Sequence, residues 1–124
     1  MIVNSYVKLA VQQAESSVMN YRMGAVVRRG NTVVGAGCNR NYHPKLRRWR
    51  SPYLTEHTGL HAEMAAVWGV RWHSLKGCII YVVRLKADGT LAMARPCPIC
   101  QAMLNDAGIK KVFYSNEHGK IVRL

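Results

Sequence analysis

The sequence predicts an α/β fold, a three-layer α/β/α sandwich built around a five-stranded mixed sheet. Apolar runs of strand length alternate with helical periodicities, in the order helix, two strands, helix, strand, helix, two strands. Only residues 116–119 separate the last two predicted strands. Because this connection is too short for a crossover helix, those strands should form an antiparallel C-terminal hairpin. At 124 residues, the chain is expected to fold as one domain spanning residues 1–124.

Three helices are predicted from apolar residues at helical spacing. The first, capped by Asn4 or Ser5, is expected to end near Met19-Asn20. Its apolar stripe comprises Val7, Ala10, Val11, Ala14 and Val18. The stripe of the second helix comprises Leu60, Met64, Val67 and Trp68. The third helix begins near Cys97 and is closed by Gly108 as a C-cap.

The strands are predicted from short apolar runs bounded by turn-forming residues. They span residues 24–27, 32–38, 78–85, 111–115 and 120–124. Turns are expected at Arg29-Gly30-Asn31, within the first hairpin, and at Asp88-Gly89. Gly35 and Gly37 weaken the second strand, but they permit the close approach of another backbone or of a ligand.

The chain is strongly basic, with 18 Lys and Arg against six Asp and Glu, a net charge of +12. This charge favours polyanionic partners such as nucleic acid, although a basic surface without a specific partner has the same composition. No apolar run is long enough to span a membrane, and no signal peptide is evident. We therefore expect no membrane partner, and either a cytoplasmic location or export as a toxin domain of a larger protein. Cys38 and Cys78 fall inside predicted strands and are expected to be buried free thiols.

Two short motifs carry the chemistry, His61-Ala62-Glu63 at the start of the second helix and Pro96-Cys97-Pro98-Ile99-Cys100 at the start of the third. His61, Cys97 and Cys100 would give zinc three protein ligands and leave the fourth position open, as in catalytic sites. Glu63 lies two residues after the histidine, where it can move protons without binding the metal. A structural zinc is the alternative, with a fourth ligand from Cys38 or another histidine, but it gives Glu63 no role.

These motifs match the H-x-E…P-C-x-x-C pattern of zinc deaminases, and the chain resembles the cytidine deaminase superfamily. The resemblance implies a cytidine-deaminase-like sandwich, a Zn²⁺ cofactor, and hydrolytic deamination of cytosine to uracil with Glu63 as the proton carrier. The C-terminal hairpin is similar to that of the group containing cytidine deaminases, blasticidin deaminase and bacterial DNA-deaminating toxins. This similarity favours cytosine over adenine.

The same resemblance implies a set of substrate contacts. These candidates are Asn39, Tyr21, Ala62, Arg95 and Pro96. Asn39 would contact the sugar, Pro96 would fix the turn into the third helix, and the backbone of Arg95 or Ala94 would face the exocyclic amine. Free-cytidine deaminases carry a glutamate two residues after this asparagine, whereas this chain has Asn41. The difference removes a carboxylate that would repel a phosphorylated sugar.

A basic and aromatic segment precedes His61 and suggests a polymeric substrate. Its candidate nucleic-acid-binding residues are Lys45, Arg47, Arg48, Trp49, Arg50 and Tyr53. Because cations mixed with stacking rings are typical of grooves that hold nucleic-acid strands, the main hypothesis is a cytosine deaminase acting on DNA. The alternative is a deaminase of free cytosine nucleotides or nucleosides, such as dCMP or cytidine, in which assembly into a homo-oligomer would complete the pocket. A third hypothesis is a non-catalytic, zinc-stabilised nucleic-acid-binding module, in which Glu63 would be superfluous.

Overall fold

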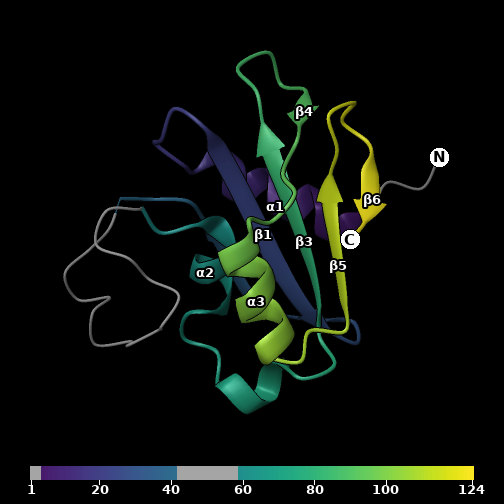
Figure 1. The fold of residues 1–124 in the computed structure, drawn as a ribbon. Helices are drawn as coiled ribbons and strands as arrows, with labels where there is room; N and C mark the ends of the chain where they lie inside the picture. The colour runs from purple at the N-terminus through teal and green to yellow at the C-terminus, as the bar shows by residue number, and fades with distance from the viewer. Residues whose placement is uncertain (1–3, 42–58) are drawn as a thin grey trace.

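The computed structural model describes residues 4–41 and 59–124, and it has the predicted three-layer architecture (Figure 1). The elements are, in chain order, α1 (Ser5–Glu15), β1 (Arg22–Arg29), β2 (Thr32–Cys38), α2 (Ala62–Val67), the 3-10 helix η2 (Trp72–Leu75), β3 (Ile79–Leu85), β4 (Leu91–Ala92), α3 (Pro98–Asp106), β5 (Lys111–Ser115) and β6 (Ile121–Arg123). In these two ranges, no helix combines the length and apolar character needed to cross a membrane.

The sheet is mixed, with the strand order β2-β1-β3-β5-β6. The β3–β5 pair is parallel, and the pairs β1–β2, β1–β3 and β5–β6 are antiparallel. The predicted C-terminal hairpin is thereby confirmed. The prediction of five strands was one short, because β4 pairs with β3 through Arg84–Ala92 and Leu85–Leu91. A two-residue strand is too short to leave a periodic pattern in the sequence.

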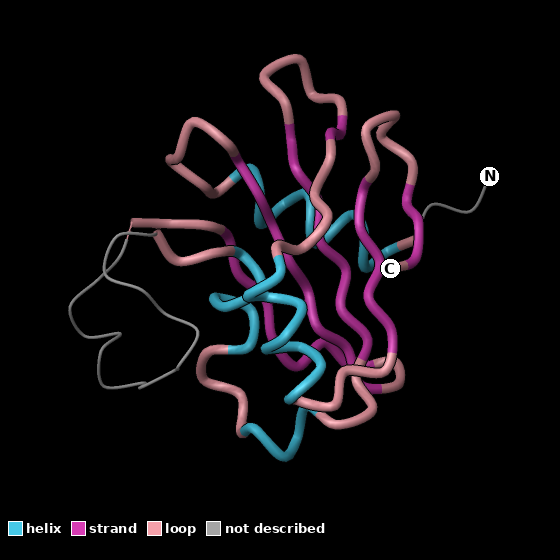
Figure 2. Tube along the Cα trace, viewed as in Figure 1, coloured by secondary structure: helices cyan, strands magenta, loops and turns pink. Residues whose placement is uncertain are grey.

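The helices lie on both faces of the sheet, as Figure 2 shows, with α1 on one face and α2 and α3 on the other. The side chains of β3 point alternately to the two faces of the sheet. Ile80 and Val82 pack in the larger core beneath α2 and α3, whereas Tyr81 and Val83 pack beneath α1. This alternation assigns each residue of β3 to one layer of the molecule.

Helix α1 is shorter than its apolar spacing predicts. It ends at Glu15 rather than near Met19-Asn20, and Val18 is 87% exposed instead of lying on the buried stripe. The Ser17 hydroxyl explains the early end, because it donates to the backbone oxygen and the side-chain Oδ1 of Asn39, at 3.0 and 2.7 Å. These tertiary hydrogen bonds turn the chain away from the helix axis.

Helix α2 packs very closely against β2, as the strand glycines suggested. A Cβ atom built on Gly37 would lie 2.6 Å from the Cβ of Ala65, and one built on Gly35 would clash with the carbonyl oxygen of Ala66. The six residues of α2 are all buried. Trp68 does not extend the apolar stripe as predicted, because the helix has ended there and the side chain is 41% exposed.

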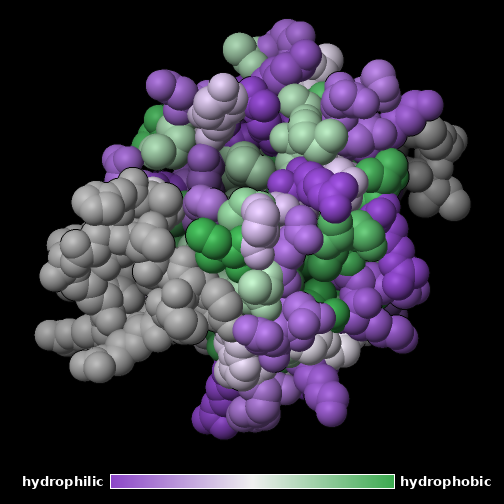
Figure 3. Space-filling view, in the orientation of Figure 1, coloured by the Kyte–Doolittle hydropathy of each residue, from purple (hydrophilic) through white to green (hydrophobic). Residues whose placement is uncertain are grey.

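The outer surface of the α2 and α3 layer is mostly polar, with apolar residues gathered beside α3 (Figure 3). A groove of about 390 Å³ lies there, lined by Gln101, Ala102, Leu104, Asn105, Ile109, Val112 and Leu124. None of the predicted metal ligands lines this groove, so it is separate from the site described next.

Candidate metal centre and active site

His61 is held at the start of α2 by a short β-bridge. Leu60 and Arg40 exchange backbone hydrogen bonds of 2.8 and 3.0 Å, which tie the entry to α2 to the chain leaving β2. Leu60 is fully buried and anchors this bridge in the core. His61 is the N-cap residue of α2 and has an extended backbone, so its side chain projects from the end of the helix.

The two cysteines are held by the first turn of α3. Cys97 is the N-cap, and its Sγ accepts a hydrogen bond from the backbone N–H of Cys100 at 3.5 Å. Pro98 begins the helix, where a missing N–H costs nothing because the first N–H groups of a helix have no intrahelical partner. The side chain of Gln101 donates to the carbonyl oxygen of Pro96 at 2.7 Å, which fixes the turn into the helix.

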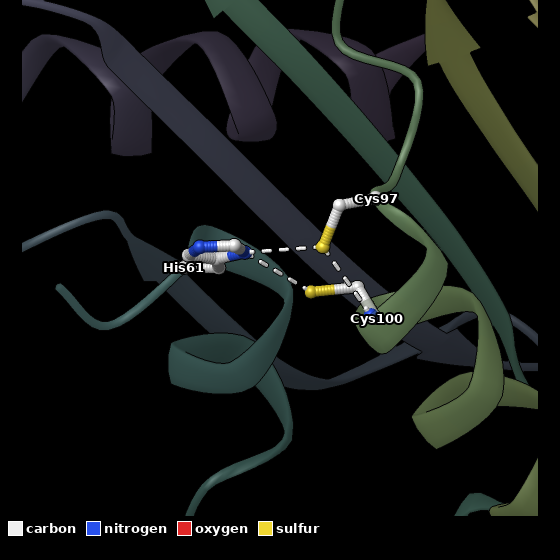
Figure 4. A group of neighbouring side chains, drawn as sticks. All are labelled: His61, Cys97 and Cys100. Atoms are coloured by element: carbon white, nitrogen blue, oxygen red, sulfur yellow. Dashed lines mark hydrogen bonds between the residues drawn. The ribbon is translucent and has the colours of Figure 1, made fainter. Parts of the chain in front are cut away.

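These two helix starts bring His61, Cys97 and Cys100 together, with the side chains pointing toward one another (Figure 4). His61 Nδ1 lies 3.3 Å from Cys100 Sγ and 3.6 Å from Cys97 Sγ. Bond lengths of about 2.0 Å to nitrogen and 2.3 Å to sulfur at a tetrahedral angle would separate N and S by roughly 3.5 Å. The spacing of the three donors therefore fits a tetrahedral zinc ion.

The protonation state of His61 fits a cation, whereas that of Cys100 would change when a cation binds. Burial lowers the pKa of His61 and favours the neutral imidazole that binds metals. Burial, together with the neighbouring Glu63 and Cys97, raises the pKa of Cys100. A bound divalent cation would offset the cost of ionising this buried thiol, because a thiol that coordinates zinc is deprotonated. Cys38 does not belong to this donor group.

Glu63 lies in the first turn of α2 and is almost completely enclosed, with 2% of its surface exposed. Burial raises its pKa to about 7, and a hydrogen bond with the side chain of Cys100 acts in the opposite direction. A carboxyl group with a pKa near neutrality can both accept and donate a proton. The arrangement thus places a buried carboxyl group beside Cys100, one of the candidate metal ligands.

Asn39 and Tyr21, two of the predicted substrate contacts, lie together. The side-chain Nδ2 of Asn39 donates to the carbonyl oxygen of Tyr21 at 2.5 Å, and its Oδ1 accepts from the backbone N–H of Met23 at 2.9 Å. The Tyr21 side chain is 60% exposed, and its ring lies 4.0 Å below the guanidinium carbon of Arg84.

The remaining predicted contacts line the entries to the two helices. Ala62 and Pro96 are buried, whereas Arg95 is exposed. The backbone N–H of Ala94 donates to the carbonyl oxygen of Ser115 at 2.8 Å, which ties this segment to the end of β5. The predicted nucleic-acid-binding residues, Lys45, Arg47, Arg48, Trp49, Arg50 and Tyr53, all lie outside the described residues.

Cys38 and Cys78 are buried free thiols, as predicted. Arg84, in contrast, was not among the predicted site residues, although its guanidinium carbon lies 4.0 Å from the ring centroid of Tyr21, a predicted substrate contact. It interrupts the apolar run of residues 78–85, and a charge inside such a run was the available signal.

Comparisons with known proteins extend these observations. The family model for the cytidine and deoxycytidylate deaminase zinc-binding region matches residues 2–116. No curated protein gives a significant sequence match.

Several solved structures are similar. The cytidine deaminase of Burkholderia pseudomallei superposes with a TM-score of 0.69 at 18% identity, over 100% of this chain and 92% of that one, and this likeness concerns the fold alone. The apo dCMP deaminase of cyanophage S-TIM5 gives a TM-score of 0.63 at 25% identity, over 91% and 81% of the two chains. The guanine deaminase of Bacillus subtilis gives 0.57 at 25% identity, over 95% and 66%.

Proposed function

The chain belongs to the family of the cytidine and deoxycytidylate deaminase zinc-binding region, and on that premise we propose that it hydrolyses the amino group of cytosine in a free nucleotide or nucleoside. Water is the second substrate, and the products are the uracil compound and ammonia. The observation that carries this proposal is the enclosed Glu63 carboxyl beside the His61, Cys97 and Cys100 donors.

The proposed roles follow from the positions of these residues. His61, Cys97 and Cys100 hold zinc, the cofactor that the family and the donor set support. When bound, zinc supplies Lewis-acid activation of a water molecule for attack on C4 of cytosine. Glu63 takes a proton from the attacking water and passes it to ring N3. It then moves the remaining proton of the attacking oxygen to the amino group as the C–N bond breaks, so that the C4 carbonyl forms and ammonia leaves as a neutral molecule.

The comparisons support a free substrate rather than DNA. The DNA hypothesis rests on the basic and aromatic residues between 45 and 53, which lie outside the described residues. The similar solved structures at 25% identity are named as deaminases of dCMP and guanine, both free compounds. Asn41, which is exposed, adds no negative charge that would repel a nucleotide phosphate.

The proposal is tested by a substrate panel. Purified zinc-loaded protein is incubated with dCMP, deoxycytidine, cytidine, guanine and a single-stranded oligodeoxynucleotide, and products are separated by chromatography while ammonia is measured. We expect turnover of at least one free cytosine compound and no uracil in the oligonucleotide. Uracil in the oligonucleotide without monomer turnover would restore the DNA hypothesis, and turnover of guanine alone would overturn both.

The role of Glu63 is tested by Glu63→Gln. We expect kcat to fall by about 10²- to 10⁴-fold, the usual contribution of a positioned proton carrier, while the zinc content stays near one ion per chain. Glu117→Gln is the matched control, because Glu117 is an exposed carboxylate in the β5–β6 turn and should leave kcat unchanged. Activity retained in Glu63→Gln would refute the assigned role.

A further inference from the structure

Arg84 lies on the sheet face that carries the candidate metal centre. Its neighbours at alternate positions of β3, Val82 and Ile80, pack in the core beneath α2 and α3. Because side chains alternate between the two faces of a strand, Arg84 continues this row at the carboxyl end of β3. Arg84 is partly exposed there, whereas Val82 and Ile80 are fully buried.

The strand register places Arg84 among residues that lead to the site. Arg84 pairs with Met23 of β1, and the carbonyl oxygen of Met23 accepts the backbone N–H of Asn39 at 3.1 Å. On its other side, Arg84 pairs with Ala92 of β4. Cys97 follows Ala92 by only five residues, so the segment leaving this pair runs directly to a predicted metal ligand.

The guanidinium of Arg84 is held in place by an aromatic ring. Tyr21 lies just before β1, and its ring centroid is 4.0 Å from the guanidinium carbon of Arg84. Between residues that the structure describes, the one ion pair joins His118 and Glu117, so no described carboxylate neutralises Arg84. A cation–π contact leaves the guanidinium N–H edges available, and the planar fork of arginine matches a phosphate group in two parallel hydrogen bonds.

We propose that Arg84, oriented by Tyr21, is the specificity-determining residue that binds the phosphate of a nucleoside 5′-monophosphate at the mouth of the His61, Cys97 and Cys100 site. This inference rests on the proposed deaminase function and narrows its substrate to a nucleotide. The net charge of +12 attracts anions in general, a nucleotide phosphate among them, but it does not separate a nucleotide from a polynucleotide.

The test compares kcat/KM for dCMP and deoxycytidine, which differ only in the phosphate, in wild type and Arg84→Gln. We expect the dCMP-to-deoxycytidine ratio to fall at least tenfold, and up to about 100-fold, because a hydrogen-bonded charge pair is lost for one substrate alone. Arg28→Gln is the matched control. Arg28 also stacks on tyrosine rings, those of Tyr6 and Tyr81, but these lie in the α1 layer, so its substitution should leave the ratio unchanged.

Each outcome bears on the inference. If Arg84→Gln lowers the ratio by less than tenfold, or if Arg28→Gln lowers it equally, Arg84 does not select the phosphate, although the deaminase function stands. If the wild type turns over neither dCMP nor deoxycytidine, this inference fails, and the proposed function fails with it only if cytidine is not turned over either. If Arg84→Gln impairs only the turnover of cytosine in a single-stranded oligodeoxynucleotide, the phosphate bound is that of a diester and the inference is overturned.

Inhibition of the wild type by inorganic phosphate tests the same inference if the Arg84→Gln variant does not fold. Inorganic phosphate should compete with dCMP and not with deoxycytidine, because it occupies the position of the phosphate and leaves the base site free. Equal inhibition of both substrates, or no inhibition of either, would contradict the inference.

Discussion

Asn39 holds three segments of the chain together with one amide. Its Oδ1 accepts from the Ser17 hydroxyl and the Met23 backbone, and its Nδ2 donates to the carbonyl of Tyr21. The side chain therefore fixes the connection between α1 and β1, which carries Tyr21 beside Arg84. Any contact that Asn39 makes with substrate is made from an amide already oriented by the protein.

Substitution of Asn39 should therefore reduce stability as well as activity. Asn39→Ala removes the partners of two donors and one carbonyl, and we expect the free energy of unfolding to fall by about 1–3 kcal/mol. Asn41→Ala is the matched control, since Asn41 is exposed, and it should change stability by less than about 0.5 kcal/mol. Urea denaturation midpoints measure both variants. Equal midpoints for Asn39→Ala and wild type would mean that this network does not stabilise the fold.

The position of α2, and with it His61, depends on two glycines of β2. Without side chains at Gly35 and Gly37, the backbone of α2 comes close enough to the sheet to bury all six helical residues. The bridge between Leu60 and Arg40 then holds His61 just beyond the end of β2. A side chain on this strand would displace the helix and the metal ligand together.

Gly37→Ala tests this packing. The new Cβ would lie 2.6 Å from the Cβ of Ala65, and we expect a loss of about 1–3 kcal/mol in stability, typical of overpacking, with a weaker affinity for zinc. Ala36→Ser adds one atom to the neighbouring exposed residue and should be neutral in both respects. Thermal unfolding and a zinc-binding titration provide the measurements. If the variant is less stable but binds zinc as tightly as the wild type, the packing of α2 on β2 does not determine the geometry of the metal site.

Features that depend on residues close together in the sequence were predictable, whereas features that depend on contacts between distant segments were not. The cysteine pair was predictable because residues three apart at a helix start share one face. The histidine motif was predictable from its match to the H-x-E pattern of zinc deaminases. The C-terminal hairpin was predictable from the length of its turn alone. The end of α1 was not, since it depends on a hydrogen bond from Ser17 to Asn39, far along the sequence. Strand β4 and the place of Arg84 likewise depend on pairing between separate segments.

At the scale of the whole molecule, the candidate metal ligands come from the starts of two different helices. His61 precedes α2 and the cysteines begin α3, and both helices pack on the same core. A bound metal would therefore cross-link this layer, and its binding energy would add to the stability of the fold.

Zinc removal should accordingly destabilise the protein. At a free zinc concentration 100 times the dissociation constant, binding contributes about 2.7 kcal/mol, so chelation should lower the Tm by about 8 °C or more. Calorimetry with and without a chelator measures the shift. Cys97→Ser should have a lower Tm that no longer responds to the chelator. A wild-type Tm that is insensitive to chelation would show that the metal does not brace the two helices.

The sheet face covered by α1 carries a layer of aromatic side chains that is separate from the candidate site. Tyr6, Tyr81 and Phe113 form a continuous stack there, with ring centroids 5.6 and 5.3 Å apart, and none of the predicted ligands belongs to it. Helix α1, which covers this face, has no acidic residue in its first turn and no basic residue in its last. Both ends are thus open to charge substitutions that favour helices. Stabilising substitutions on α1 lie on the opposite face of the sheet from the candidate metal ligands. They should therefore raise the stability of the protein without changing its activity.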